Sequence, residues 1–144
     1  MKKIVVCVDL NQACFETLKK LPEKIDLNNT MVYFVHVIES PLYDDDLSPF
    51  SFRLPENDVL LKKTILETLN NFGLELGLSP ESVIAKCIFS TSRSEKIKNY
   101  LDEVGADLVV IATRGRHGIA GLFSSSLADF LIKFSPCNVL VLRP

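Results

Sequence analysis

Apolar runs and amphipathic stretches alternate along the whole chain. The first run, residues 3–9 (KIVVCVD), is continuous and rich in β-branched side chains, a pattern typical of a strand that is covered on both faces. Similar runs occupy residues 31–38, 83–89, 106–113 and 138–143. Lys86 interrupts the run at residues 83–89, and this predicts a strand at the edge of a sheet.

Four amphipathic stretches separate these runs and predict helices. Asn11 is a candidate N-cap of the first helix, serines can cap the third, and Gly105 stands at the C-terminal end of the third. The stretches cover residues 11–21, 58–76, 92–105 and 125–135. The second helix carries one apolar stripe, formed by Leu61, Ile65, Leu69, Phe72 and Leu76.

Alternation of strands and helices predicts an α/β fold with a parallel sheet covered by helices on both faces. The length suits one domain, residues 1–144. In such sheets, ligands bind beyond the carboxyl ends of strands, where neighbouring connections leave on opposite faces. Asp9 ends the first strand and Ala112 ends the fourth, so these residues line one site if the two strands are neighbours.

The segment at residues 40–57 has a different character. It carries three prolines, and because proline lacks the N–H that regular structure needs, we expect a long loop. Three adjacent aspartates, Asp44, Asp45 and Asp46, form either a solvated acidic turn or a contact for a partner or a metal ion.

Composition narrows the classes of function. The net charge is −2 and no basic block occurs, which argues against a nucleic-acid or anionic-membrane partner. The cysteines form no C-x-x-C pair, so we expect no zinc site, and Cys7, Cys87 and Cys137 are expected to be buried as small apolar residues. The N-terminal apolar run is too short for a signal peptide or a membrane span, which favours a cytoplasmic protein.

The stretch at residues 108–126 (LVVIATRGRHGIAGLFSSS) joins a buried strand to a helix through a glycine-rich turn. The free N–H groups at a helix N-terminus suit phosphate, Gly115 lets the backbone approach an anion, and Arg114 and Arg116 add donors. Alternatively, the serines only cap the helix and the arginines are solvated. The turn is neither a Walker P-loop nor a dinucleotide fingerprint.

The chain resembles the universal stress protein family over nearly its whole length. The resemblance rests on KIVVCVD, VYFVHVIE, ADLVVIATRGRHGIAGLF and SPCNVLVLRP. It implies a five-stranded parallel sheet of order 3-2-1-4-5, a homodimer and, in some members, bound ATP. It further implies that Asp9 holds the ribose and adenine region and that Val37 contacts adenine.

Nucleotide-binding members of that family carry the motif G-x2-G-x9-G-[ST]. Aligned on this sequence, the motif falls on Ala112, Gly115, Ser125 and Ser126, so two of the four positions are kept. Ala112 is tolerable if its φ is negative. Ser125 is strained if its φ is positive, but it adds a donor to phosphate if it has N-cap geometry.

Three functions follow from this resemblance. The first is a cytoplasmic homodimer that holds or senses an adenine nucleotide, with Mg²⁺ accompanying ATP. The second is an interaction protein of the same fold without a nucleotide. The third is a slow ATP hydrolase, for which Asp9 and His117 are the nearby candidates to orient water. We expect the last strand to be an apolar sheet edge that pairs antiparallel with a second copy, near Val139 and Val141.

Overall fold

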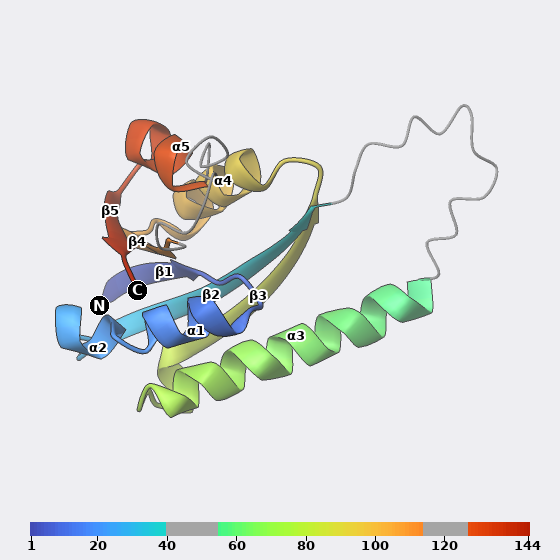
Figure 1. Ribbon diagram of the computed structural model, residues 1–144, viewed down its shortest axis with the longest axis horizontal. Helices are drawn as coiled ribbons and strands as arrows, with labels where there is room; N and C mark the ends of the chain where they lie inside the picture. Colours follow the sequence, from blue (N-terminus) through green and yellow to red (C-terminus); the bar gives the residue numbers. More distant parts are fainter. Residues whose placement is uncertain (40–54, 114–126) are drawn as a thin grey trace.

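The computed structural model describes residues 1–39, 55–113 and 127–144 (Figure 1). Its five strands form one parallel sheet of order β3-β2-β1-β4-β5, which confirms the predicted fold and places β3 and β5 at the two edges. The strands are β1 (Lys2–Cys7), β2 (Thr30–Glu39), β3 (Val83–Ser90), β4 (Leu108–Ala112) and β5 (Asn138–Leu142).

Helices cover both faces of the sheet. Helices α1, α2 and α3 contribute to one apolar cluster, and α4 and α5 contribute to the other, on the opposite face (Figure 1). Three details differ from the prediction. The first helix is divided in two, the second begins at Pro55 within the predicted loop, and the turn before β3 contains a 3-10 helix. The helices are α1 (Gln12–Leu18), α2 (Leu21–Lys24), α3 (Pro55–Glu75), η1 (Pro80–Ser82), α4 (Arg93–Val104) and α5 (Leu127–Phe134).

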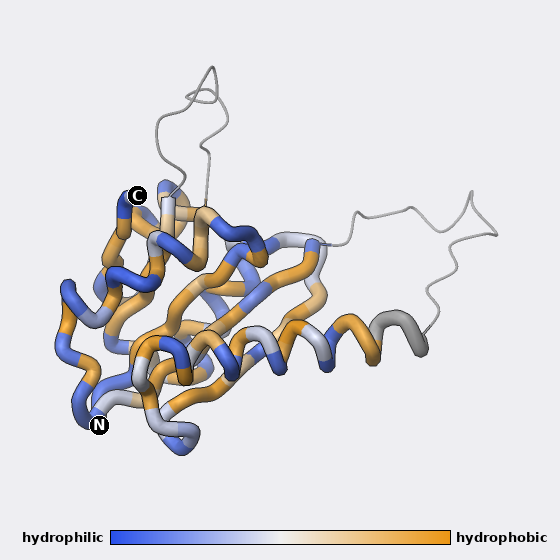
Figure 2. Tube along the Cα trace, turned by 60° about the horizontal axis from the view of Figure 1, so that its bottom comes forward, coloured by the Kyte–Doolittle hydropathy of each residue, from blue (hydrophilic) through white to orange (hydrophobic). Residues whose placement is uncertain are grey.

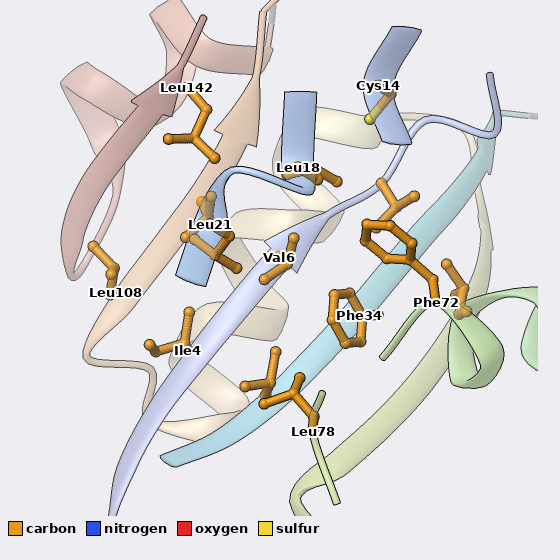
Figure 3. Close-up of a cluster of buried hydrophobic side chains, with 14 of the residues drawn as sticks. Ile4, Val6, Cys14, Leu18, Leu21, Phe34, Phe72, Leu78, Leu108 and Leu142 are labelled. Atoms are coloured by element: carbon orange, nitrogen blue, oxygen red, sulfur yellow. The ribbon is translucent and has the colours of Figure 1, made fainter. Parts of the chain in front are cut away.

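Central strand β1 sends alternate side chains into the two clusters. Ile4 and Val6 point toward α1, α2 and α3, whereas Val5 and Cys7 point toward α4 and α5. In the first cluster, the Phe72 ring of α3 meets the Phe34 ring of β2 edge to face, with 5.7 Å between the ring centroids (Figure 3). Each fully buried aliphatic side chain stabilises the fold by about 1.5–3 kcal/mol.

The apolar stripe of α3 is buried only in part. Ile65, Leu69 and Phe72 are buried, but Leu61, at the N-terminal end of the stripe, is 46% exposed. Helix α3 diverges from β2 and β3 toward its N-terminal end (Figures 1 and 2). The helical periodicity therefore continues past the point at which the sheet can cover it.

Two predicted caps are confirmed. The Asn11 side chain accepts a hydrogen bond from the Cys14 N–H at 2.9 Å and caps α1. Gly105 ends α4 with φ of +63°, in the left-handed region that favours glycine.

The cysteine prediction holds for Cys7 and Cys87, which are buried, but Cys137 is only half-buried. Cys137 immediately precedes edge strand β5, and there the second cluster only partly covers it. None of the helices within the described ranges is long and apolar enough to span a bilayer.

Gly73 lies in α3 where the helix packs closely on the sheet. A Cβ at this position would lie 2.8 Å from Cγ2 of Val83 and 3.2 Å from the Phe34 ring. We expect Gly73→Ala to lower the free energy of unfolding by about 1–2 kcal/mol, because overpacking outweighs the gain in helix propensity. Urea unfolding measures this difference.

The matched control is Gly73→Ala in a Val83→Ala background, where the two closest methyl groups are gone. In that background, the alanine at position 73 should be neutral or stabilising. Equal losses in both backgrounds would contradict close packing as the cause.

Two weak acids are buried on the α4 and α5 face. Burial raises the pKa of the Cys7 thiol to about 12, although the nearby Arg93 guanidinium lowers it. Burial also raises the pKa of Tyr100 to about 12, and the neighbouring Tyr33 and Glu103 raise it further. The unfolded chain releases both protons at lower pH, so alkali favours unfolding.

We therefore expect the free energy of unfolding to fall as the pH rises from about 9 to about 12. Tyr100→Phe removes one of the groups whose pKa is raised by burial and should make this decline shallower above pH 10. Urea unfolding at a series of alkaline pH values measures both slopes. A native-like slope in Tyr100→Phe would contradict the assignment.

Candidate functional site

Three strand ends meet at the carboxyl edge of the sheet. Cys7 pairs with Val35 of β2 and with Ile111 of β4. Asp9, Val37 and Thr113 each follow these paired residues by two positions in the chain. The chain leaves β1 for α1 on one face, whereas β4 precedes α5 on the other face, so this edge is a topological switch point (Figure 1).

Asp9 is held at this edge by bonds to elements on both faces of the sheet. Its N–H donates to the Cys14 Sγ at 3.3 Å, and its carbonyl accepts from the Asn11 N–H at 2.8 Å. Its carboxylate Oδ1 forms an ion pair with Nη2 of Arg93 at 2.7 Å. The side chain that caps α1 is that of Asn11, so the Asp9 carboxylate is left to face α4.

A carboxylate from β2 holds the start of α4. Oε1 of Glu39 accepts a hydrogen bond from the Arg93 N–H at 2.8 Å. Ser92 occupies the N-cap position but its side chain makes no capping bond, so the prediction that serines cap this helix was wrong. A carboxylate is favourable here because the helix N-terminus carries partial positive charge.

Arg93 and Glu39 are the site residues that sequence reasoning missed. Their positions along the chain could have indicated both residues, because Glu39 ends β2 and Arg93 comes shortly after β3. In a parallel sheet, the carboxyl ends of β2 and β3 lie at the same edge as Asp9. No pattern in the sequence indicates that the side chains of Arg93 and Asp9 form an ion pair.

The second strand contributes an apolar and a polar group to this edge. Val37 is buried in the α4 and α5 cluster, on the face to which Cys7 also points. His36 points to the other face, where its Nδ1 lies 2.7 Å from the Val8 carbonyl oxygen. Because a carbonyl can only accept, Nδ1 carries the proton, and this bond ties β2 to the end of β1.

Ala112 is the last residue of β4, as predicted. Asn29 is the only described residue other than glycine with positive φ, so the backbone at Ala112 does not require glycine. The next residue, Thr113, donates its N–H to the Leu142 carbonyl at 2.9 Å and continues the pairing with β5. Several predicted site residues lie outside the described ranges: Asp44, Asp45, Asp46, Arg114, Gly115, Arg116, His117, Ser125 and Ser126.

The described part of the chain contains no group of three or more histidine, cysteine, aspartate or glutamate side chains that could hold a metal ion. At the carboxyl edge, Arg93 stands between the carboxylates of Asp9 and Glu39. The edge therefore offers hydrogen-bond acceptors and one cation to an organic ligand.

Comparison with known proteins identifies the fold. The model of the universal stress protein family matches residues 1–143. The chain belongs to the universal stress protein family. A Staphylococcus haemolyticus protein assigned to the universal stress proteins is 20% identical over 142 residues, which cover 99% of this chain and 84% of that protein.

Solved structures of universal stress proteins share this fold. The Archaeoglobus fulgidus protein in complex with dAMP is 20% identical with a TM-score of 0.65, covering 99% of this chain and 98% of that chain. The Arabidopsis thaliana protein with AMP bound is 18% identical with a TM-score of 0.65, covering 99% of this chain and 92% of that chain. The five-stranded parallel sheet is thus the fold of universal stress proteins.

The unusual cap of α4 can be tested by stability. Glu39→Ala removes the acceptor of the Arg93 N–H and should lower the free energy of unfolding by about 1 kcal/mol. Ser92→Ala is the matched control and should change it by about 0.5 kcal/mol or less, because this side chain makes no capping bond. Urea unfolding measures the free energy of unfolding of both variants. A larger loss in Ser92→Ala than in Glu39→Ala would show that Ser92 caps the helix.

Proposed function

We propose that this protein binds an adenine nucleotide at the carboxyl edge between β1 and β4. The observation that supports the proposal most directly is the Asp9 carboxylate, held at the switch point with one oxygen on Arg93. The dAMP and AMP complexes of the two universal stress proteins compared above are further support.

The contacts divide between two parts of the chain. Asp9 accepts a hydrogen bond from a ribose hydroxyl, and Val37 offers apolar surface to adenine. Ala112 allows close approach of the strand end, where its negative φ makes glycine unnecessary. Gly115, Arg116, Ser125 and Ser126, which lie outside the described residues, would hold the phosphates through backbone N–H groups, a guanidinium and hydroxyls.

The nucleotide we propose is ATP, with Mg²⁺ bound through its phosphates. In this proposal the protein acts in the cytoplasm and holds or senses the nucleotide rather than turning it over. The alternative is an interaction protein of the same fold with no nucleotide. Ser125, where nucleotide-binding members have glycine, is the observation that favours this alternative.

Calorimetry with ATP tests the proposal. We expect micromolar binding to the native protein, weakened by about 1.5–3 kcal/mol in Asp9→Ala, the typical value of a hydrogen bond to a charged group. Gly115→Val and Ser126→Ala should also weaken it. If the Cβ of Ser125 crowds the phosphate, Ser125→Gly should strengthen it.

One outcome would contradict nucleotide binding, and the other would contradict only the proposed contact of Asp9. One is the absence of heat with ATP, ADP or AMP at millimolar concentration for both the native protein and Ser125→Gly. That result would favour the interaction-protein alternative. The other is unchanged affinity in a folded Asp9→Ala variant, which would exclude the proposed contact with the ribose.

We further propose a homodimer through β5. This strand ends the sheet, and its Val139 and Val141 are half-buried. The preceding helix exposes two more large apolar side chains, Ile132 (62%) and Phe134 (54%). An apolar edge of this kind is stabilised by pairing with a second copy, and twofold symmetry makes the two β5 strands antiparallel.

Charged substitutions on the two edge strands test the dimer. Val139→Lys and Val141→Lys should convert the dimer to a folded monomer at micromolar concentration. Ile84→Lys is the matched control, because Ile84 is an exposed apolar residue on the opposite edge strand, and the dimer should persist. Sedimentation equilibrium measures the mass, and circular dichroism verifies folding. A monomeric native protein, or a dimer indifferent to both β5 substitutions, would contradict the proposal.

A further inference from the structure

The ion pair between Asp9 and Arg93 connects two elements at the switch point. Nη2 of Arg93 lies 2.7 Å from Oδ1 of Asp9, and the two side chains are 30% and 31% exposed. This separation places the two opposite charges in direct contact. No described residue makes a hydrogen bond to the second carboxylate oxygen, Oδ2.

Arg93 is itself held in place by its neighbours. It is the first residue of α4, and its N–H is bonded to the Glu39 carboxylate at 2.8 Å. Further along α4, Ile97 and Leu101 are buried against the sheet. The guanidinium therefore projects from an anchored helix, which positions a side chain more accurately than a loop does.

Asp9, in contrast, lies between the end of β1 and the start of α1, outside any strand or helix. Its backbone is bonded to the start of α1, while its carboxylate can turn about two side-chain torsions. A carboxylate that is free to rotate loses this freedom when a ligand binds, and the loss weakens binding. The bond to Arg93 removes that freedom in advance.

We propose that Arg93 is a positioning residue that fixes Oδ1 of Asp9 and thereby presents Oδ2 to the ribose hydroxyls of the nucleotide. This inference rests on the nucleotide-binding function proposed above.

An opposite role for Arg93 would be that of a competitor, which the ligand must displace from Asp9. The chemistry of the carboxylate argues against this role. An ionised carboxylate has about four acceptor positions on its two oxygens, so a guanidinium on Oδ1 and a hydroxyl on Oδ2 bind together. The two roles predict opposite changes in affinity when the guanidinium is removed.

The experiment compares two nucleotides on two forms of the protein. ATP carries both ribose hydroxyls, and 2′,3′-dideoxy-ATP carries neither. We expect Arg93→Met to weaken ATP binding about tenfold, which is the scale of ordering one side chain. The affinity for the dideoxy nucleotide, which makes no hydroxyl contact, should stay within about twofold of native. Calorimetry measures all four affinities.

Three further variants sharpen the comparison. Lys96→Met removes an exposed cation from the same helix and should leave both affinities unchanged. Arg93→Lys keeps a charged donor and should recover part of the loss. In an Asp9→Asn background, Arg93→Met should cause no further loss of ATP affinity, because the two residues act through one contact.

Each outcome separates this inference from its rivals. Tighter ATP binding in Arg93→Met would overturn positioning in favour of competition. Equal losses for both nucleotides would show a purely structural role, and unchanged ATP affinity would show no role. If the native protein and Ser125→Gly bind neither nucleotide, the proposed function fails, and the inference about Arg93 fails with it.

Discussion

Burial of β1 on both faces is the constraint on which the rest of the structure depends. Residues 4–8 are all nearly inaccessible to solvent, with β2 and β4 paired to the two sides of the strand and helices over both faces. This stretch of residues 4–8 has no room for a polar side chain. Asp9 is the first charged residue after it, and it stands where the chain leaves the core. The central strand thus places the Asp9 carboxylate at the carboxyl edge of the sheet, where the connections after β1 and β4 leave on opposite faces.

The same constraint explains why the site draws on several elements. Neighbouring strands in parallel register end at one edge, so β1, β2 and β3 bring Asp9, Glu39 and the start of α4 together there. Two carboxylates alone would repel each other. Arg93 relieves this repulsion by pairing its guanidinium with the Asp9 carboxylate and donating its backbone N–H to Glu39. Arg93 therefore connects the ends of β1 and β2 to the start of α4.

Apolar, β-branched runs were sufficient to predict the strands and their alternation with helices. A strand that is buried on both faces requires apolar side chains at successive positions, and this pattern is visible in the sequence. The position of Asp9 at the edge followed from the same pattern. Leu61 belongs to the predicted stripe but is exposed, because helical periodicity carries no information on where the sheet ends. The Glu39 bond and the Asp9–Arg93 pair were missed because they depend on side-chain geometry between residues far apart in the chain. Ser92 had the right residue type for a cap, but the Glu39 carboxylate takes that role.

The charge balance at this edge also explains how one fold can gain or lose a nucleotide. Glu39, Asp9 and Arg93 together carry one net negative charge, so they suit hydroxyl and amino donors better than phosphate. Attraction for phosphate must come from elsewhere, and residues 114–126, with two arginines and three serines, have the required donors. In the proposed function, the acceptor for the ribose follows directly from the buried core, whereas the donors for the phosphates belong to residues 114–126. On that proposal, serine in place of glycine at position 125 affects the phosphate contacts and not the contact between Asp9 and the ribose.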